Sequence, residues 1–322
     1  MTRAAHCLAR EGEERLARTK KNLALRRNVF DAVRRFFGQN GFLEVDTPLC
    51  IAAPAPEPHI DNAKAGDHFL QASPELHMKR LLCAGYENIF QLCKCFRENE
   101  RGDLHLPEFT MLEWYAASAD YGCMMDQVEE LVRFISIETL GSLKVQYGKT
   151  VIDMAAPWQR MRLEDAFDKF AGMDMKTAID RDLFEEKLAF EIEPALDTHR
   201  PVFLHDYPSA NTPLAKSVPG NPEAAQRFEL YLAGIEICNG YSERTDEKLL
   251  RARFESELSQ RIKAGRPLSP MPERFLEDMA NMPDAAGCAL GLDRLVMVLA
   301  DARTIDDVVA FIPEDEWETR RQ

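Results

Sequence analysis

Long apolar runs are missing from this sequence of 322 residues, and no stretch approaches the ~20 apolar residues that a membrane-spanning helix needs. Residues 1–21 also lack the apolar core of a secretory signal peptide. The formal net charge of −14 argues against a general binder of duplex nucleic acid, because such proteins gain affinity by neutralising phosphates. With 45% hydrophobic residues the chain can build a core, so we expect a cytoplasmic globular protein without membrane association.

Cysteine spacings typical of zinc sites are also missing. The 8 cysteines include no CxxC pair and no Cys/His array. Cys93 and Cys95 would share one face of a strand, but nothing nearby completes a tetrahedral site. We therefore expect reduced, buried thiols.

Internal repeats, low-complexity tracts and Gly/Ser linkers are absent, which predicts a single domain over residues 1–322. Helical spacing of apolar residues predicts helices over 25–38 and 122–140, and residues 141–200 are expected to mix helix and loop. Strand-like runs lie at 41–46, 68–71, 89–96, 109–115, 202–204, 227–242 and 287–291. Without a regular βαβ alternation, this order predicts an α+β fold with a largely antiparallel β-sheet flanked by helices.

The N-terminus is basic although the chain is acidic. Residues 1–40 contain ten Lys or Arg against four Asp or Glu. Residues 1–24 form either a basic arm that faces an acidic partner or a solvated helix, and both interpretations stay open.

The first block with chemical content covers residues 96–115, two strand-like segments joined by a polar loop. Arg97 ends the first segment, and a planar guanidinium grips phosphate oxygens well. Phe109 opens the second segment and can stack a base. Glu113 and Tyr115, two residues apart, would share one face. A surface hairpin with solvated charges is the alternative.

The second block covers residues 227–243. Ala233-Gly234 predicts a tight turn that places Glu229 opposite Glu236. Two opposed carboxylates repel, so the pair makes sense if a divalent cation bridges them to phosphates. If the turn lies one residue away, both carboxylates are simply exposed.

The third block, residues 287–299, is a strand with spaced glycines that runs into an apolar helix. Gly287 and Gly291 would let a ligand approach the backbone closely, and Asp293 would cap the helix. Arg294 then lies in the first turn, at a helix start that favours anions.

These three blocks, with the helix–strand segment 25–48 that ends in Pro48, resemble the ordered motifs of class II aminoacyl-tRNA synthetases. Residues 73–76, 213–216 and 239–243 are similar to the lysine branch of that family. The resemblance implies a single catalytic domain with a class II antiparallel sheet, ATP and Mg²⁺ as cofactors, and a homodimer formed through residues 25–48.

Two departures from lysyl-tRNA synthetases modify this expectation. Only about two dozen residues precede the first motif, so we expect a basic arm over 1–24 and no anticodon-binding domain or stable tRNA binding. Ala289 stands where those enzymes have glycine, which would alter the lysine isomer accepted. Both features resemble stand-alone paralogues that ligate (R)-β-lysine to a lysine of elongation factor P. A truncated lysyl-tRNA synthetase that charges tRNA with lysine, or an inactive regulatory paralogue, are the alternatives.

The resemblance also implies residue roles. Arg97 and Arg294 would be catalytic, and Glu229 and Glu236 would hold Mg²⁺. Phe109 would stack adenine against Arg294, which with His105 would reach the distal phosphates. Asn99 and Leu106 depart from the motif, replacing its Glu and Asn. The full expected ATP site is Arg97, Glu98, Asn99, His105, Phe109, Glu236, Ile237, Gly291 and Arg294. The expected site for lysine or β-lysine is Ser73, Pro74, Glu75, Glu113, Tyr115, Asn239, Glu243 and Ala289.

Overall fold

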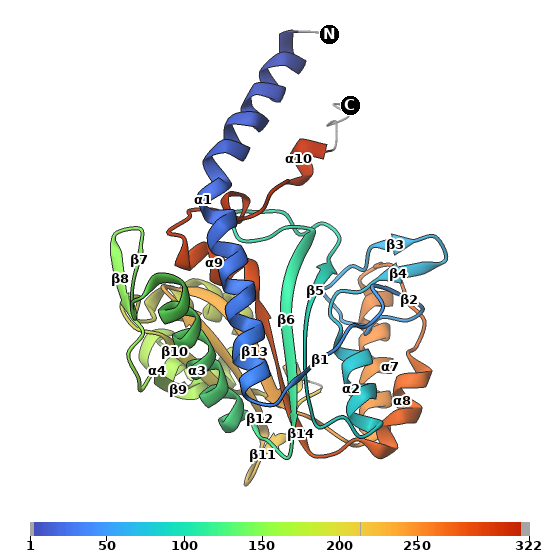
Figure 1. Ribbon diagram of the computed structural model, residues 1–322. Coiled ribbons are helices and arrows are strands. Elements are labelled where there is room, and N and C mark those ends of the chain that lie inside the picture. Colours follow the sequence, from blue (N-terminus) through green and yellow to red (C-terminus); the bar gives the residue numbers. More distant parts are fainter. Residues whose placement is uncertain (1–2, 213, 317–322) are drawn as a thin grey trace.

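A nine-stranded sheet forms the centre of the protein (Figure 1). The computed structural model describes residues 3–212 and 214–316, and it does not describe the side chains of residues 3–13 and 211. The edge pairs β1–β5 and β9–β10 are parallel, and the pairs between them are antiparallel, as expected. In spatial order the strands are β1 (Leu43–Glu44), β5 (Asn88–Phe96), β6 (Glu108–Ala117), β14 (Ala285–Gly291), β13 (Ile235–Ser242), β12 (Asn221–Leu232), β10 (Val202–Pro208) and β9 (Gln159–Arg162), with β11 (Ser217–Val218) paired to β12.

Helices cover one face of the sheet completely. There α1 (Arg3–Gln39), α3 (Tyr121–Leu140) and α9 (Leu292–Leu299) enclose the main core. The apolar spacing predicted for α1 is confirmed, because Val29, Val33, Phe36 and Phe37 are all buried. On the other face, α2 (Glu75–Cys83), α7 (Glu247–Lys263) and α8 (Glu273–Asp278) form a separate layer near β5 and β6 (Figure 1). At the other end of that face, α4 (Leu163–Phe170), α5 (Met175–Asp180) and α6 (Phe184–Lys187) pack on β10 and β12. The part of the face between these two layers holds the site described below.

Several elements escaped the sequence analysis. The segment 141–200 contains three short strands besides helices, and four residues are too few for a periodic pattern to show. The remaining elements are β2 (Cys50–Ile51), β3 (Lys64–Ala65), β4 (His68–Leu70), β7 (Lys144–Tyr147), β8 (Thr150–Asp153), α10 (Pro313–Glu316), a π-helix (Leu188–Ile192) and 3₁₀-helices at Glu193–Ala195, Ser209–Asn211, Met279–Asn281 and Ile305–Val308.

Helix α1 is continuous and projects from the body beside α10 (Figure 1). Two of its arginines contact the acidic segment 306–316 near the C-terminus, so part of the positive charge of the helix is compensated within the chain. Arg15 Nη1 donates to the carbonyl of Asp306 at 3.1 Å, and Arg18 pairs with Asp307 at 3.2 Å. The helix runs through residue 24 without interruption and ends at Gln39, one residue beyond the predicted stop at Gly38.

The cysteine prediction is half right. All cysteines whose side chains are described are free, and Cys93, Cys95, Cys238 and Cys288 are buried as expected. Cys50 and Cys123 are exposed instead. Cys7 lies among the residues whose side chains are not described.

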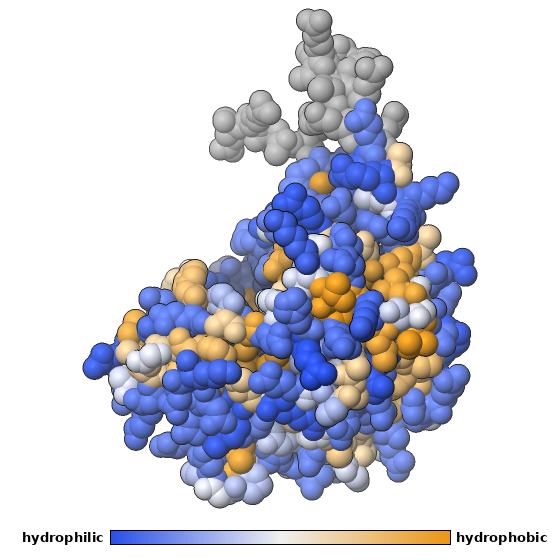
Figure 2. Space-filling model, turned by 90° about the vertical axis from the view of Figure 1, so that its left-hand side faces the viewer, coloured by the Kyte–Doolittle hydropathy of each residue, from blue (hydrophilic) through white to orange (hydrophobic). Residues whose placement is uncertain are grey.

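The surface is mostly hydrophilic, with apolar patches on the flank below the projecting helix (Figure 2). Ile137 and Leu140 of α3 are exposed, as are Leu43 and Leu49 after α1. Within residues 3–212 and 214–316, no helix combines the length and apolarity required to cross a membrane.

Candidate active site

Two rows of paired residues cross the open face of the sheet. Because residues opposite one another in a sheet share a face, each row brings distant parts of the sequence together. The first row runs through Gln91, Glu113, Ala289, Asn239 and Glu229. The second row runs through Ile89, Tyr115, Gly287, Tyr241 and Arg227. The three motif blocks therefore meet on one surface, as the sequence predicted.

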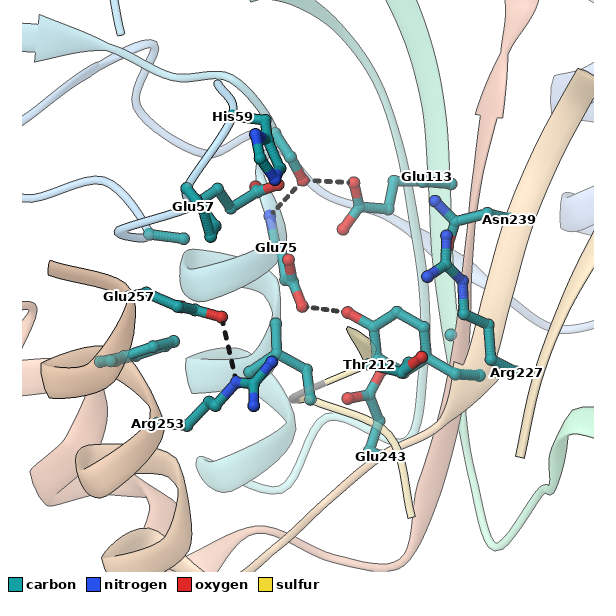
Figure 3. Close-up of a pocket in the computed structure, with 18 of the residues that line it drawn as sticks. Glu57, His59, Glu75, Glu113, Thr212, Arg227, Asn239, Glu243, Arg253 and Glu257 are labelled. Carbon is teal, nitrogen blue, oxygen red and sulfur yellow. Dashed lines mark hydrogen bonds and ion pairs between the residues drawn. The ribbon is translucent and has the colours of Figure 1, made fainter. Parts of the chain in front are cut away.

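A cavity of about 640 Å³ lies over these rows (Figure 3). Its walls come from the sheet, from the start of α2, from α7 and from the loop between β2 and β3. Of the residues predicted to bind ATP or substrate, those that line it are Ser73, Glu75, Arg97, Glu113, Tyr115, Asn239, Glu243 and Ala289. Pro74 lies beside them as the N-cap residue of α2.

Glu113 is held by hydroxyl groups on both of its oxygens. Ser73 Oγ donates to Glu113 Oε2 at 2.7 Å, and the Tyr115 hydroxyl donates to Oε1 at 2.6 Å. Ser73 Oγ in turn accepts from the backbone N–H of Glu75 at 3.1 Å (Figure 3). Burial raises the pKa of Glu113 to about 7, and the charge of Glu75 adds to this. A cationic substrate would stabilise the ionised form.

Gly287 has a different purpose from the one expected. A Cβ at this position would overlap the ring of Tyr115, so the glycine makes room for that side chain and not directly for a ligand. At Gly291 a Cβ would meet its nearest neighbours, Arg294 and the carbonyl of Ile237, at an ordinary 3.7 Å. The second glycine is therefore not required by its protein neighbours.

Lys79 is a central residue that the sequence analysis missed. Its Nζ lies 2.6 Å from Glu75 Oε1 and 2.6 Å from Glu243 Oε2. The Tyr241 hydroxyl also donates to Glu75 Oε1. Burial alone would lower the pKa of Lys79, but the negative charges of Glu243 and Glu75 outweigh burial and raise that pKa. For Glu243, burial raises the pKa to about 8. The i,i+4 spacing of Glu75 and Lys79 was the available signal.

A second group of predicted residues lies outside the cavity lining. Arg294 Nη2 is 2.5 Å from His105 Nε2, and Arg294 Nη1 is 3.1 Å from Glu236 Oε2. Burial, helped by the charge of Arg294, lowers the pKa of His105. The structure thus brings these three residues together at one site.

The loop after β5 carries the remaining predicted ATP residues. The Arg97 guanidinium lies 5.1 Å from the centre of the Phe109 ring. Glu98 and Asn99 are exposed in the loop that follows and do not line the cavity. Ile237 is buried in the core on the covered face of the sheet.

The expected opposition of Glu229 and Glu236 is wrong. The Ala233-Gly234 turn is confirmed, but a register shift between Leu230 and Tyr231 pairs Glu236 with Tyr231, and Glu229 with Asn239. Both carboxylates nevertheless share one face. Glu229 lies 2.6 Å from Arg227 Nη2 and accepts from the hydroxyls of Tyr207 at 2.6 Å and Tyr231 at 2.7 Å.

The chemistry of the two carboxylates suits Mg²⁺, whose ligands in proteins are oxygens. Within the described ranges, no group of three or more His, Cys, Asp or Glu side chains could hold a metal. Mg²⁺ commonly takes one or two carboxylates and completes its shell with water and substrate phosphates. The Glu236 side chain is 40% exposed and available for this, whereas Glu229 would share its oxygens with its present donors.

Asp293 does not cap α9 as expected. Gly291 is the N-cap residue, and Asp293 accepts from the backbone N–H of Thr110 at 2.8 Å and pairs with Arg26 of α1 at 2.5 Å. Arg294 is in the first turn, as predicted. Leu106, which replaces the motif's Asn, is buried in the core.

Other cavity residues lay outside the predicted set. Many of them come from the loop between β2 and β3, from the segment after β10 and from α7, none of which shows a pattern that points to a site. Arg227, two residues before Glu229 on a predicted strand, was the one with a readable signal. The labelled examples in Figure 3 are Glu57, His59, Thr212, Arg227, Arg253 and Glu257.

Comparison with known proteins places this geometry in a family. Residues 12–315 match the family model "tRNA synthetases class II (D, K and N)". A lysine–tRNA ligase of Moorella thermoacetica is 37% identical over 91% of this chain and 65% of its own length. Elongation factor P–(R)-β-lysine ligases of Edwardsiella ictaluri and Erwinia tasmaniensis are each 36% identical over 90% of this chain and 94% of their own length. The chain belongs to the class II tRNA synthetase family.

Proposed function

We propose that the protein is an ATP-dependent ligase that activates (R)-β-lysine as an aminoacyl-adenylate and joins it to the ε-amine of a lysine on elongation factor P. The observation that carries the proposal is the cavity, in which Glu75, Glu113 and Glu243 gather beside Arg97. Three carboxylates suit a substrate with two amines, and the guanidinium suits a phosphate next to it. The relatives named for this ligation, matched over 94% of their length, support the same assignment.

The carboxylates divide between the two amines of the substrate. Glu75 receives the amine nearest the reacting carboxyl group, while Glu113, Tyr115 and Glu243 receive the terminal ammonium. Ser73, Pro74 and Asn239 complete the pocket. Because Glu113 and Glu243 have raised pKa values, a bound cation would draw them into the ionised form.

ATP lies next to this pocket in the proposal. Arg97 contacts the α-phosphate, Phe109 stacks the adenine, and Arg294 with His105 reaches the distal phosphates. Glu98 and Asn99 contact the nucleotide from the loop after β5, while Ile237, whose side chain is buried on the covered face, and Gly291 contact it through backbone atoms. Glu236 and Glu229 hold Mg²⁺, which supplies neutralising charge to the phosphates when it is bound.

The reaction then has two steps. The substrate carboxylate attacks the α-phosphorus of ATP, and pyrophosphate leaves with the electron pair of the broken P–O bond. An amine of the acceptor protein attacks the carbonyl carbon of the adenylate, and AMP leaves. The residues of the chain act by positioning and by stabilising charge, so no covalent enzyme intermediate is needed.

Ala289 supports β-lysine over α-lysine. It lies between Glu113 and Asn239 in the first row, and it lines the cavity. Its methyl group narrows the site where lysyl-tRNA synthetases have glycine. One carbon in a pocket changes binding by about 1–3 kcal/mol, enough for a preference between isomers.

A lysine–tRNA ligase activity is the alternative, and the relative at 37% identity favours it. The two are separated by incubating the protein and ATP with radiolabelled lysine or β-lysine and with either tRNA or elongation factor P. Label on elongation factor P, with no stable tRNA binding, supports the proposal, and label on tRNA alone contradicts it. Failure of pyrophosphate exchange with every amino acid would indicate an inactive regulatory paralogue.

We also propose a cytoplasmic homodimer formed through residues 25–48. Leu43 in that segment and Leu49 just after it are 52% and 40% exposed, so these apolar side chains are accessible to a partner subunit. Sedimentation at working concentration should give twice the mass of the chain. A monomer would contradict this part of the proposal.

A further inference from the structure

The loop between β2 and β3 carries a glutamate into the cavity. Glu57 lines the cavity, and its backbone is fixed by Arg261 of α7, which is 3% exposed. Arg261 Nη1 donates to the carbonyls of Glu57 and Ile60 at 2.7 Å each, and its Nη2 lies 2.8 Å from Asp61 Oδ1. This anchoring positions the loop, and with it the start of the Glu57 side chain, against the substrate pocket.

The Glu57 carboxylate has no hydrogen-bond or ion-pair partner among the described residues, unlike Glu75, Glu113 and Glu243. Figure 3 shows it beside His59, on the wall opposite Glu113 and Asn239. Burial raises its pKa to about 7, and the charges that act on it most are Arg97, which lowers that pKa, and Glu75, which raises it. Glu57 lines the same cavity as Arg97 and Glu75, the two groups that flank the acyl–phosphate bond of the proposed adenylate.

Activation of the amino acid has no use for such a base, because the attacking carboxylate is already ionised. The transfer step does need one. A lysine ε-amine is protonated at neutral pH and cannot attack a carbonyl until it loses a proton. An unpaired carboxylate near the reacting carbonyl meets that need.

We propose that Glu57 is the general base of the transfer step and receives the acceptor lysine. This inference rests on the proposed ligation. Glu57 takes one proton from the ε-ammonium, and the nitrogen electron pair forms the C–N bond to the carbonyl carbon. The C–O bond to the phosphate breaks with its electron pair on AMP. The remaining surplus proton leaves the nitrogen for solvent, which gives the neutral amide.

The test separates the two steps with Glu57→Gln, which keeps the shape of the side chain but cannot take a proton. Pyrophosphate exchange with β-lysine reports activation, and labelling of elongation factor P in single turnover reports transfer. Glu255→Gln, an exposed glutamate on α7, is the matched control. We expect exchange to stay within about threefold in both variants and transfer to fall about 10²–10⁴-fold in Glu57→Gln alone.

The pH dependence of transfer gives a readout that a structural role would not move. Arg97, Glu75, Arg227, Glu100 and Glu257 are the charged groups that act on Glu57 or are acted on by it. Transfer by the unsubstituted protein should rise with pH and level off above about pH 7, where Glu57 is ionised. In Glu57→Gln it should keep rising towards pH 9, as free amine accumulates. Glu57→Asp should recover part of the rate.

Three outcomes overturn the inference. Full transfer by Glu57→Gln, or an equal loss of exchange and transfer, means that Glu57 is not the base. If Glu57→Gln does not fold, the same comparison in Glu57→Asp decides, and equal losses there count against the inference. If the unsubstituted protein labels no elongation factor P, the proposed function itself fails, which is a distinguishable result.

Discussion

Lys79 Nζ lies 2.6 Å from Glu243 Oε2, with only 2% and 1% of the two side chains exposed. The same ammonium holds Glu75, so one buried cation compensates two carboxylates from elements far apart in the sequence. Ions buried this way are costly to remove from water and are tolerated only while they stay paired. Glu75 and Glu243 can therefore stay ionised in the buried site because Lys79 is paired with both of them.

Replacing Lys79 with Met should lower the free energy of unfolding by about 3–5 kcal/mol, because Glu243 and Glu75 lose their compensating charge. Urea denaturation at neutral pH measures this. Lys263→Met, at an exposed position on α7, is the control and should change stability by less than about 0.5 kcal/mol. Equal stability of the two variants would show that the ion pairs contribute nothing.

Glu257 should make the protein less stable as pH rises. Burial raises its pKa to about 7, with Arg253 opposing and Glu57 assisting the shift. A carboxyl whose folded pKa lies above its usual 4.5 stabilises the fold fully below pH 4.5 and loses that contribution as pH rises towards 7. In Glu257→Gln, the stability difference between pH 5 and pH 8 should shrink by about 3 kcal/mol. If the stability difference between pH 5 and pH 8 in Glu257→Gln equals that in Glu255→Gln, the raised pKa of Glu257 is contradicted.

Much of the site was predictable because its residues lie on strands, where successive side chains point to alternate faces of the sheet. Glu113 and Tyr115 needed only a spacing of two, and the register then joined Glu113 to Ala289 and Asn239. The prediction that Glu229 lies opposite Glu236 was wrong because a bulge adds one residue to β13. The pattern of apolar residues in the sequence does not indicate where a bulge occurs.

Other groups were unpredictable for a different reason. Glu57 lies in an irregular loop, and its place depends on Arg261, some two hundred residues away. Lys79 is on a short helix where a lysine normally points to solvent. Their burial is a property of tertiary packing, which local sequence does not encode.

Arg97→Ala should abolish pyrophosphate exchange, with a loss of about 10³-fold, while the protein remains folded. Arg97 is the cavity's guanidinium beside Phe109, and loss of one charge-stabilising donor typically costs 10²–10³-fold. Exchange assays with β-lysine and circular dichroism measure both quantities. Arg27→Ala, exposed on α1, should leave exchange unchanged. Near-normal exchange in Arg97→Ala would refute the role of this residue.

Ala289→Gly should shift the preference from β-lysine towards α-lysine by about 10–200-fold, as expected when one carbon is removed from a pocket. The ratio of pyrophosphate exchange rates with the two isomers measures this. Ala286→Gly makes the same change on the same strand but on the core face. It should lower stability and leave the ratio intact. A ratio that moves equally in both variants would exclude Ala289 as a determinant of specificity.

The order of the strands also has a consequence for biosynthesis. The first row places β14 between β6 and β13, so the strand at 285–291 joins residues that were synthesised much earlier. Until the ribosome has released it, β6 and β13 lack their shared neighbour, and nascent chains that end before it cannot form the continuous first row. The pairing of β14 is therefore the last strand pairing of the central sheet that synthesis makes possible, and until then the facing edges of β6 and β13 are unpaired.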